Sequence, residues 1–128
     1  MPQPDKRPKT AGKSSPRVAL LVETSNAYGR GVLSGIAEYV QAHGPWSVYL
    51  PETGRADDTA ASRLRGWRGD GVLVRAEDRA TAKAAAACGC AVVDLSAAGL
   101  LPNAPAVHSD LRAEAENGFR HLWERRLP

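Results

Sequence analysis

The chain has 128 residues, of which 43% are hydrophobic and 24% charged, and this is enough for one domain around a single core. Only 5% of the residues are aromatic, which argues against the stacking surface of a protein that binds single-stranded nucleic acid. Residues 1–17 carry five basic side chains and one acidic side chain, whereas residues 18–128 carry 12 basic and 13 acidic ones. We therefore expect no strongly basic DNA-binding face outside the N-terminal segment.

Residues 1–16 combine several prolines with lysine, arginine and serine, and we expect a disordered basic tail there. The segment contains no secretory signal, and the chain has no apolar run long enough to cross a membrane. Cys88 and Cys90 lie too close together for an unstrained disulfide, and are expected to be two small buried thiols. These features predict a cytoplasmic protein.

From Arg17 the pattern becomes regular. Residues 18–22 form a short apolar run, which is typical of a strand buried on both faces of a parallel sheet. In residues 32–40 the apolar side chains recur every three or four positions, which predicts an amphipathic helix. Gly44 and Pro45 end that helix, and the alternating residues 46–50 predict a second strand.

The same strand-and-helix unit repeats along the rest of the chain. We expect three further helices: one over 60–67 capped by Asp57 or Asp58, one capped by Asp78 and running through Ala87, and a last one capped by Asp110. Between them we expect a strand at 71–74, a strand at 91–95 and a short fifth strand at 106–108. The inward face of that last helix is predicted to consist of Leu111, Ala115, Phe119, Leu122 and Trp123.

This alternation predicts an α/β fold, a parallel sheet of about five strands with helices on both faces. Ligands of such sheets bind at the carboxyl ends of the strands. Here those ends are rich in hydroxyls, carboxylates and arginine, and suit a polar small ligand; they are Glu23–Tyr28, Glu52, Arg75–Asp78, Asp94–Ser96 and Ser109–Asp110. Helix capping is an alternative explanation for the aspartates Asp58, Asp78 and Asp110.

The spacing of three glycines indicates a second class of function. Gly29, Gly31 and Gly35 follow a predicted strand and open a helix, with one residue more than the dinucleotide fingerprint allows. Glu52 lies about where an acid that binds ribose would fall. The alternative function is therefore a fragment of an NAD(P)-binding, Rossmann-type oxidoreductase.

No residue set points to catalysis. The three histidines have no mutual spacing for a metal site or for a nucleophile and its base, and no Ser, His and Asp set has the context of a hydrolase. We expect no enzyme activity, no catalytic residue, no metal and no cofactor.

The sequence VALLVETSNAYGRGVLSGIAEY at 18–39, followed by His43-Gly-Pro-Trp46, resembles the sensor domain of xylose operon regulators. These are AraC-type transcription factors whose sensor is similar to the periplasmic-binding-protein fold of LacI-type repressors. Three further segments match in order, namely 67–73, 90–95 and 107–110. The resemblance covers roughly residues 17–125.

The resemblance implies two lobes that clamp a sugar, and a C-terminal helix-turn-helix region that binds operator DNA. Residues 17–128 correspond to most of the first lobe, so we expect weak or undetectable binding of a pentose-type sugar and DNA binding only through a region missing from this chain. The exposed apolar faces left by the missing lobe favour a homodimer. The expected first-lobe ligand contacts are Ser25, Asn26, Tyr28, Glu77 and Asp110.

Overall fold

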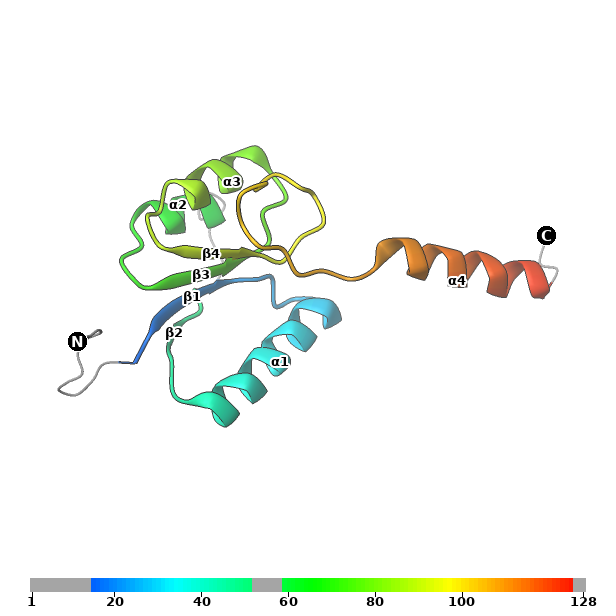
Figure 1. Ribbon diagram of the computed structural model, residues 1–128, viewed down its shortest axis with the longest axis horizontal. Coiled ribbons are helices and arrows are strands. Elements are labelled where there is room, and N and C mark those ends of the chain that lie inside the picture. The colour runs from blue at the N-terminus through cyan, green and yellow to red at the C-terminus, as the bar shows by residue number, and fades with distance from the viewer. Residues whose placement is uncertain (1–14, 52–58, 126–128) are drawn as a thin grey trace.

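The protein is described by a computed structural model that covers residues 15–51 and 59–125. The N-terminal segment 1–14 and the residues Glu52, Asp57 and Asp58 lie outside the described residues. Four parallel strands form one sheet in the order β2-β1-β3-β4 (Figure 1). Their bounds are Arg17–Leu21 for β1, Ser47–Tyr49 for β2, Gly71–Val74 for β3 and Ala91–Asp94 for β4. The predicted parallel α/β fold is confirmed.

Helices cover both faces of the sheet, as the sequence predicts. Helix α1, Ala27–His43, lies on one face, and α2, Ala60–Arg65, and α3, Arg79–Ala86, lie together on the other (Figure 1). Successive side chains of a strand point to opposite faces. All four residues of β1 after Arg17 are buried, which explains why its sequence is a continuous apolar run.

The main core lies between the sheet and the two short helices α2 and α3. Small side chains on α3 let that helix approach the strands closely, and Leu64 of α2 fills the space between them. The buried cluster consists of Ala19, Leu21, Leu64, Val72, Val74, Ala76, Ala82, Ala85 and Leu101.

The predicted fifth strand is wrong. Ala106 forms only an isolated parallel bridge with Asp94, where the Asp94 N–H donates to the Pro105 carbonyl at 2.9 Å and the Val107 N–H donates to the Asp94 carbonyl at 2.8 Å. Pro105 has no N–H, so a regular ladder cannot continue through it. The sheet of the described residues accordingly has four strands rather than about five.

The inward face predicted for the last helix is also wrong. Helix α4, Leu111–Glu124, leaves the body of the protein instead of packing on it (Figure 1). Its large apolar side chains are exposed, at 55% for Leu111, 67% for Phe119, 53% for Leu122 and 73% for Trp123. The apolar spacing shows which face of a helix avoids water, but it does not provide the surface that covers that face.

The helix caps follow the sequence with one correction. Asp78 and Asp110 cap α3 and α4 as predicted, and each accepts a hydrogen bond from the backbone N–H three residues on. For α2 the cap is Thr59 rather than Asp57 or Asp58. Thr59 and Ser62 form a reciprocal capping box, in which each side chain accepts from the other residue's N–H at 3.1 Å.

The two cysteines lie in the turn between α3 and β4, and both are half-buried and free. Gly89 between them has φ +77°, a left-handed conformation that favours glycine and brings the two sulfurs to 3.0 Å. Burial raises the pKa of the Cys90 thiol to about 12, and the hydrogen bond with Cys88 acts in the same direction. The thiol of Cys90 is therefore protonated at neutral pH.

Candidate ligand-binding site

The carboxyl ends of the three strands β1, β3 and β4 lie at one end of the sheet. The register sets Leu21 opposite Val74, and Val74 opposite Asp94, so the three strands end level with one another. The loops that follow therefore start side by side along a common edge, which we call the rim. It contains the segments 22–28, 75–78 and 95–98.

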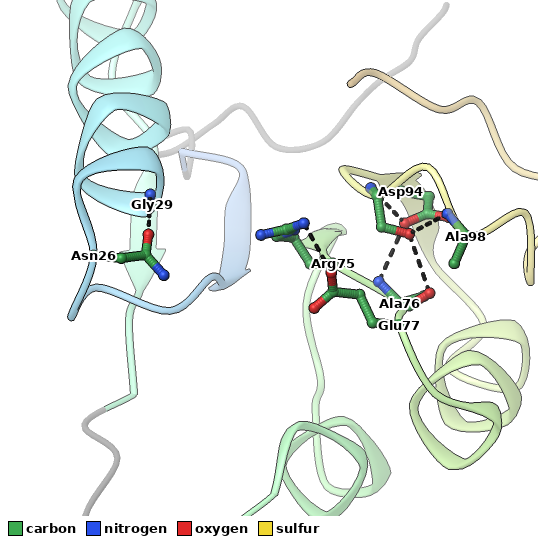
Figure 2. A network of polar contacts seen from close by, with 8 residues as sticks. Asn26, Gly29, Arg75, Ala76, Glu77, Asp94 and Ala98 are labelled. Carbon is green, nitrogen blue, oxygen red and sulfur yellow. Dashed lines mark hydrogen bonds and ion pairs between the residues drawn. The ribbon is translucent and has the colours of Figure 1, made fainter. Parts of the chain in front are cut away.

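The first rim segment connects β1 to α1. Asn26 is the N-cap of α1, and its Oδ1 accepts a hydrogen bond from the Gly29 N–H at 2.7 Å (Figure 2). The Ser25 hydroxyl donates to the Glu23 carboxylate. The Arg30 guanidinium donates to the Thr24 carbonyl at 3.3 Å. These local bonds hold Ser25 and Asn26 in a defined turn at the surface.

Gly29 is required by this turn. A Cβ atom at that position would lie 1.7 Å from the Glu23 carbonyl oxygen, whereas a Cβ at Gly31 or Gly35 would meet nothing within 4 Å. The first glycine of the apparent dinucleotide motif thus has a packing explanation within this chain. Glu52, the expected ribose-binding acid, lies outside the described residues.

Two of the predicted ligand residues are connected through Arg75. The Arg75 guanidinium lies over the ring of Tyr28, with Cζ 4.9 Å from the ring centroid. Its Nη2 pairs with the Glu77 carboxylate at 2.8 Å (Figure 2). Tyr28 lies in the first turn of α1, whereas Arg75 and Glu77 follow β3, so the contact joins two rim segments. The Arg75 Nε is shielded from solvent and has no hydrogen-bond partner among the described residues, which leaves it a spare donor.

A buried polar network supports this part of the rim. Asp94 is 1% exposed, and its Oδ1 accepts hydrogen bonds from the Ala76 N–H at 3.2 Å and the Ser96 N–H at 3.0 Å (Figure 2). The Ser96 hydroxyl donates to the Ala76 carbonyl at 3.1 Å and accepts from the Ala98 N–H at 3.2 Å. Because both backbone polar groups of Ala76 are held by Asp94 and Ser96, the segment that carries Arg75 and Glu77 is fixed.

Asp110 stands apart from the other predicted ligand residues. Its carboxylate accepts from the Ala113 N–H at 3.0 Å and caps α4. Among the described residues, no polar contact joins Asp110 to Ser25, Asn26, Tyr28 or Glu77. The structure therefore brings Tyr28 and Glu77 together through Arg75, places Ser25 and Asn26 on the adjacent turn, and leaves Asp110 as a helix cap.

Arg75 and Asp94 are not among the five expected ligand contacts, although both belong to the polar strand ends that the sequence indicates. Arg75 directly follows the strand predicted at 71–74, and Asp94 lies near the end of the strand predicted at 91–95. This position at a strand end is the feature of the sequence that could have identified them. That Arg75 meets Tyr28, and that Asp94 is buried behind it, depends on the order β1-β3-β4, which places distant segments next to each other. The described residues contain no group of three or more His, Cys, Asp or Glu side chains placed to hold a metal ion.

Two hollows flank the sheet. One, of about 480 Å³, lies between α1 and the ends of β3 and β4, and Tyr28 lies in its wall. The other, of about 870 Å³, runs along α3 and the edge strand β4, and its lining is mainly alanine, valine, leucine and proline. The polar side chains that contact one another gather at the rim, whereas the larger hollow has Arg79, Lys83 and Asn103 among mostly apolar side chains, so we assign the candidate site to the rim.

The comparisons with known proteins agree with this architecture. The chain is similar to the xylose operon regulatory proteins of Escherichia coli strains K12, O6:H1 and O157:H7, with 32% identity over 114 residues in each case. The aligned part is 85% of this chain but only 28% of each relative. No solved structure matches the chain. A family model described as the XylR N-terminal domain matches residues 17–107.

This match covers most of the chain and includes the whole sheet with helices α1, α2 and α3. The resemblance noted in the sequence is thereby confirmed, and so is the fold class that it implies. The relatives named above are, by name, regulatory proteins of the xylose operon. The chain belongs to the family of XylR N-terminal domains.

Proposed function

We propose that this chain is the N-terminal sensor portion of a cytoplasmic, xylose-type transcriptional regulator, and that a pentose docks on its rim. The observation that carries the proposal is the Tyr28–Arg75–Glu77 cluster, which joins an aromatic ring, a cation and a carboxylate at the carboxyl ends of a parallel sheet. That edge is where ligands of open α/β sheets bind. The matched relatives are named for the xylose operon, which supports a pentose as the ligand.

The chemistry of the rim suits a polyhydroxylated ligand. Tyr28 is 42% exposed, so its ring offers an apolar face to sugar C–H groups and its hydroxyl a donor and acceptor. Glu77 accepts hydrogen bonds from sugar hydroxyls, and Arg75 donates to sugar oxygens. Ser25 adds a hydroxyl on the adjacent turn. Asn26 contributes mainly by positioning, because its Oδ1 is used by the cap of α1.

The chain spans little more than a quarter of the length of the relatives that it matches. In a two-lobed sensor, a sugar held between lobes stabilises the closed arrangement only to the extent that it binds that arrangement better than the open one. A single lobe supplies part of those contacts, and we expect an affinity on the order of 1 mM or weaker. Operator binding would belong to a helix-turn-helix region that these residues do not include.

Among the described residues, no helix has the length and apolar character needed to cross a bilayer. The regulator class of the matched relatives and the free thiols of Cys88 and Cys90 support a cytoplasmic location. The oxidoreductase alternative loses its main support, because the close approach of Glu23 already accounts for Gly29.

The test is a titration of the isotope-labelled 128-residue chain, followed by backbone amide shifts. D-Xylose, titrated to roughly 100 mM so that it well exceeds a dissociation constant of about 1 mM, should shift the amides of 25–28 and 75–77. Sorbitol and NAD+ serve as comparison ligands. Shifts confined to other regions, or a response to NAD+ but not to xylose, would contradict the proposal.

Two exposed tyrosines of α1 provide a matched pair of variants. Tyr28→Ala should abolish the xylose-dependent shifts, whereas Tyr39→Ala should leave them intact, because Tyr39 lies about 16 Å further along the helix. Tyr39 is 52% exposed and stacks on His43. Equal responses of the two variants would remove Tyr28 from the site.

A further inference from the structure

Cys88 and Cys90 form a pair of thiols at the end of the sheet opposite the rim. Both belong to the turn between α3 and β4, and Cys90 lies directly before β4 begins at Ala91. Their sulfurs are 3.0 Å apart, and both side chains are half-buried against the main core. Two thiols held this close act as one bidentate group toward an atom that bonds two sulfurs.

The turn that carries the thiols is held by backbone hydrogen bonds on both sides. The Cys88 N–H donates to the Ala85 carbonyl of α3 at 3.2 Å, and the Ala91 N–H donates to the Asp70 carbonyl at 3.3 Å. Gly89, between the two thiols, has φ +77°, and this left-handed conformation folds the chain back on itself. The sulfurs are therefore brought together before a ligand arrives, so binding does not have to order the turn.

The chemistry of the pair preserves it as a dithiol. A direct disulfide between residues two positions apart is strained. Burial raises the pKa of the Cys90 thiol to about 12, so this thiol is protonated at neutral pH, and protonated thiols are oxidised slowly. Both sulfurs thus remain available to a reagent that replaces the thiol protons without oxidising sulfur.

The number of sulfurs selects the class of ligand. Among the described residues, no group of three or more His, Cys, Asp or Glu side chains is placed to hold a metal ion, whereas a structural zinc ion takes four such ligands. Thiolates are soft ligands and favour soft acceptors, of which trivalent arsenic is one. An arsenic atom that already carries one carbon substituent is completed by two sulfurs, and two are present here.

A small reagent can reach the pair from solvent. Cys90 lies in the wall of the hollow of about 870 Å³ along α3 and β4, together with Ala86 and Ala91. Both alanines are exposed, and their side chains are small. The hollow therefore leaves room beside the Cys90 sulfur for the organic substituent of an arsenical.

We propose that Cys88 and Cys90 form a binding site for monosubstituted trivalent arsenicals, in which one arsenic atom bridges the two sulfurs. With an arsenoxide, R–As=O, two S–H bonds break and two S–As bonds form, and the two protons leave with the arsenoxide oxygen as one water molecule. Arsenic stays trivalent and sulfur is not oxidised, so the step needs no further reagent. The inserted arsenic atom also enlarges the ring that a direct disulfide would close, which relieves its strain.

The first test is the intact mass of the reduced, folded chain after mixing with phenylarsine oxide. The chain should gain the mass of one reagent molecule less one water. The adduct should survive millimolar glutathione, which is a monothiol, and should be removed by dimercaptopropanol, which offers two sulfurs. Absence of the adduct, or its removal by glutathione, would overturn the proposal.

Serine variants test whether both sulfurs are needed. Cys88→Ser and Cys90→Ser each leave one sulfur, and the loss of one of two linked bonds should weaken binding by roughly 100-fold or more. Neither variant should therefore keep the adduct in glutathione. Ala87→Ser adds a hydroxyl to the same turn without removing a sulfur, and this control should keep the adduct. Backbone amide spectra show whether each variant is folded, and a stable adduct on either single-thiol variant would refute the bridge.

Two glycines test whether the folded turn presets the sulfurs. Gly89 and Gly99 have φ +77° and +75°, and a Cβ at either position meets nothing within 4 Å. Alanine therefore strains both turns alike, but only Gly89 separates the two thiols. In competition with dimercaptopropanol, Gly89→Ala should weaken the binding of phenylarsine oxide by at least about threefold, whereas Gly99→Ala should leave it unchanged. Equal affinities of the two variants would overturn the assignment of the site to this turn.

Discussion

The Arg75 guanidinium lies over the Tyr28 ring at 4.9 Å and ties the start of α1 to the end of β3. These two residues are 47 positions apart in the sequence, and the adjacent pairing of β1 and β3 brings them together. Arg75 also pairs with Glu77, so one cation holds an aromatic ring and a carboxylate in a common orientation. At Tyr28, Arg75 and Glu77 the rim thus presents a connected cluster, which lies beside the helix caps Asn26 and Asp78.

Replacing Arg75 tests whether this cation organises the rim. Arg75→Met retains much of the aliphatic bulk but removes the charge, and we expect the apparent dissociation constant for xylose to rise by at least about fivefold. Stability should fall by about 1 kcal/mol or less, because cation–π contacts and partly exposed ion pairs are each weak. Amide-shift titration measures the first effect and urea unfolding the second. Arg120→Met on α4 is the control, and an equal loss of xylose binding there would refute the assignment.

The close contact at Gly29 predicts that alanine has very different effects on stability at two glycines of the same helix. Gly29→Ala drives a methyl group against the Glu23 carbonyl and should destabilise the protein by more than about 1 kcal/mol, since backbone must move. Gly31→Ala meets nothing within 4 Å and should stabilise it by up to about 1 kcal/mol through helix propensity. Thermal unfolding measures the melting temperatures of both variants. Similar melting temperatures would mean that the turn is not as tight as described.

The buried carboxylate of Asp94 is expected to matter for stability. Asp94→Ala leaves the Ala76 and Ser96 N–H groups without their acceptor, at a cost of about 2 kcal/mol or more. Amide exchange should also quicken at 76–77, where the segment is released. Glu38→Ala on the exposed side of α1 should change the unfolding free energy by less than about 0.5 kcal/mol. An unchanged free energy of unfolding for Asp94→Ala would contradict this prediction, and would show that water replaces the carboxylate as the acceptor.

The lowered pKa of Asp78 predicts that the stability of the protein depends on pH. Hydrogen bonds from the Thr81 backbone N–H and then the Thr81 hydroxyl lower the pKa of Asp78 below its usual 3.8. The folded protein therefore favours the ionised form, and this contribution is present above pH 3.8 and is lost as the pH falls through the lowered folded value. Asp78→Asn keeps a capping oxygen without the charge, so its melting temperature should lie below that of the parent at about pH 6 and converge with it in acid. A constant difference across this range would contradict the charge effect.

Local features of the fold follow from neighbouring residues in the sequence. The apolar run at 18–22, the period of 32–40 and the caps at Asp78 and Asp110 involve side chains close together in the chain, and they correctly predict β1, α1, α3 and α4. The cap of α2 is harder to place from the sequence, because Thr59, which also caps well, stands next to Asp57 and Asp58. The family is likewise visible in short motifs.

The amino-acid sequence by itself determined the four helices and the four strands of the sheet, the parallel α/β class and the family, because each depends on short-range spacing and side-chain type. Only the tertiary structure decided that 106–108 contributes one bridge instead of a strand, that Arg75 meets Tyr28, and that the large apolar side chains of α4 stay exposed. The physical reason is that strand order and register create contacts between distant residues. Periodicity marks an apolar face, but the partner of that face is set by the rest of the fold.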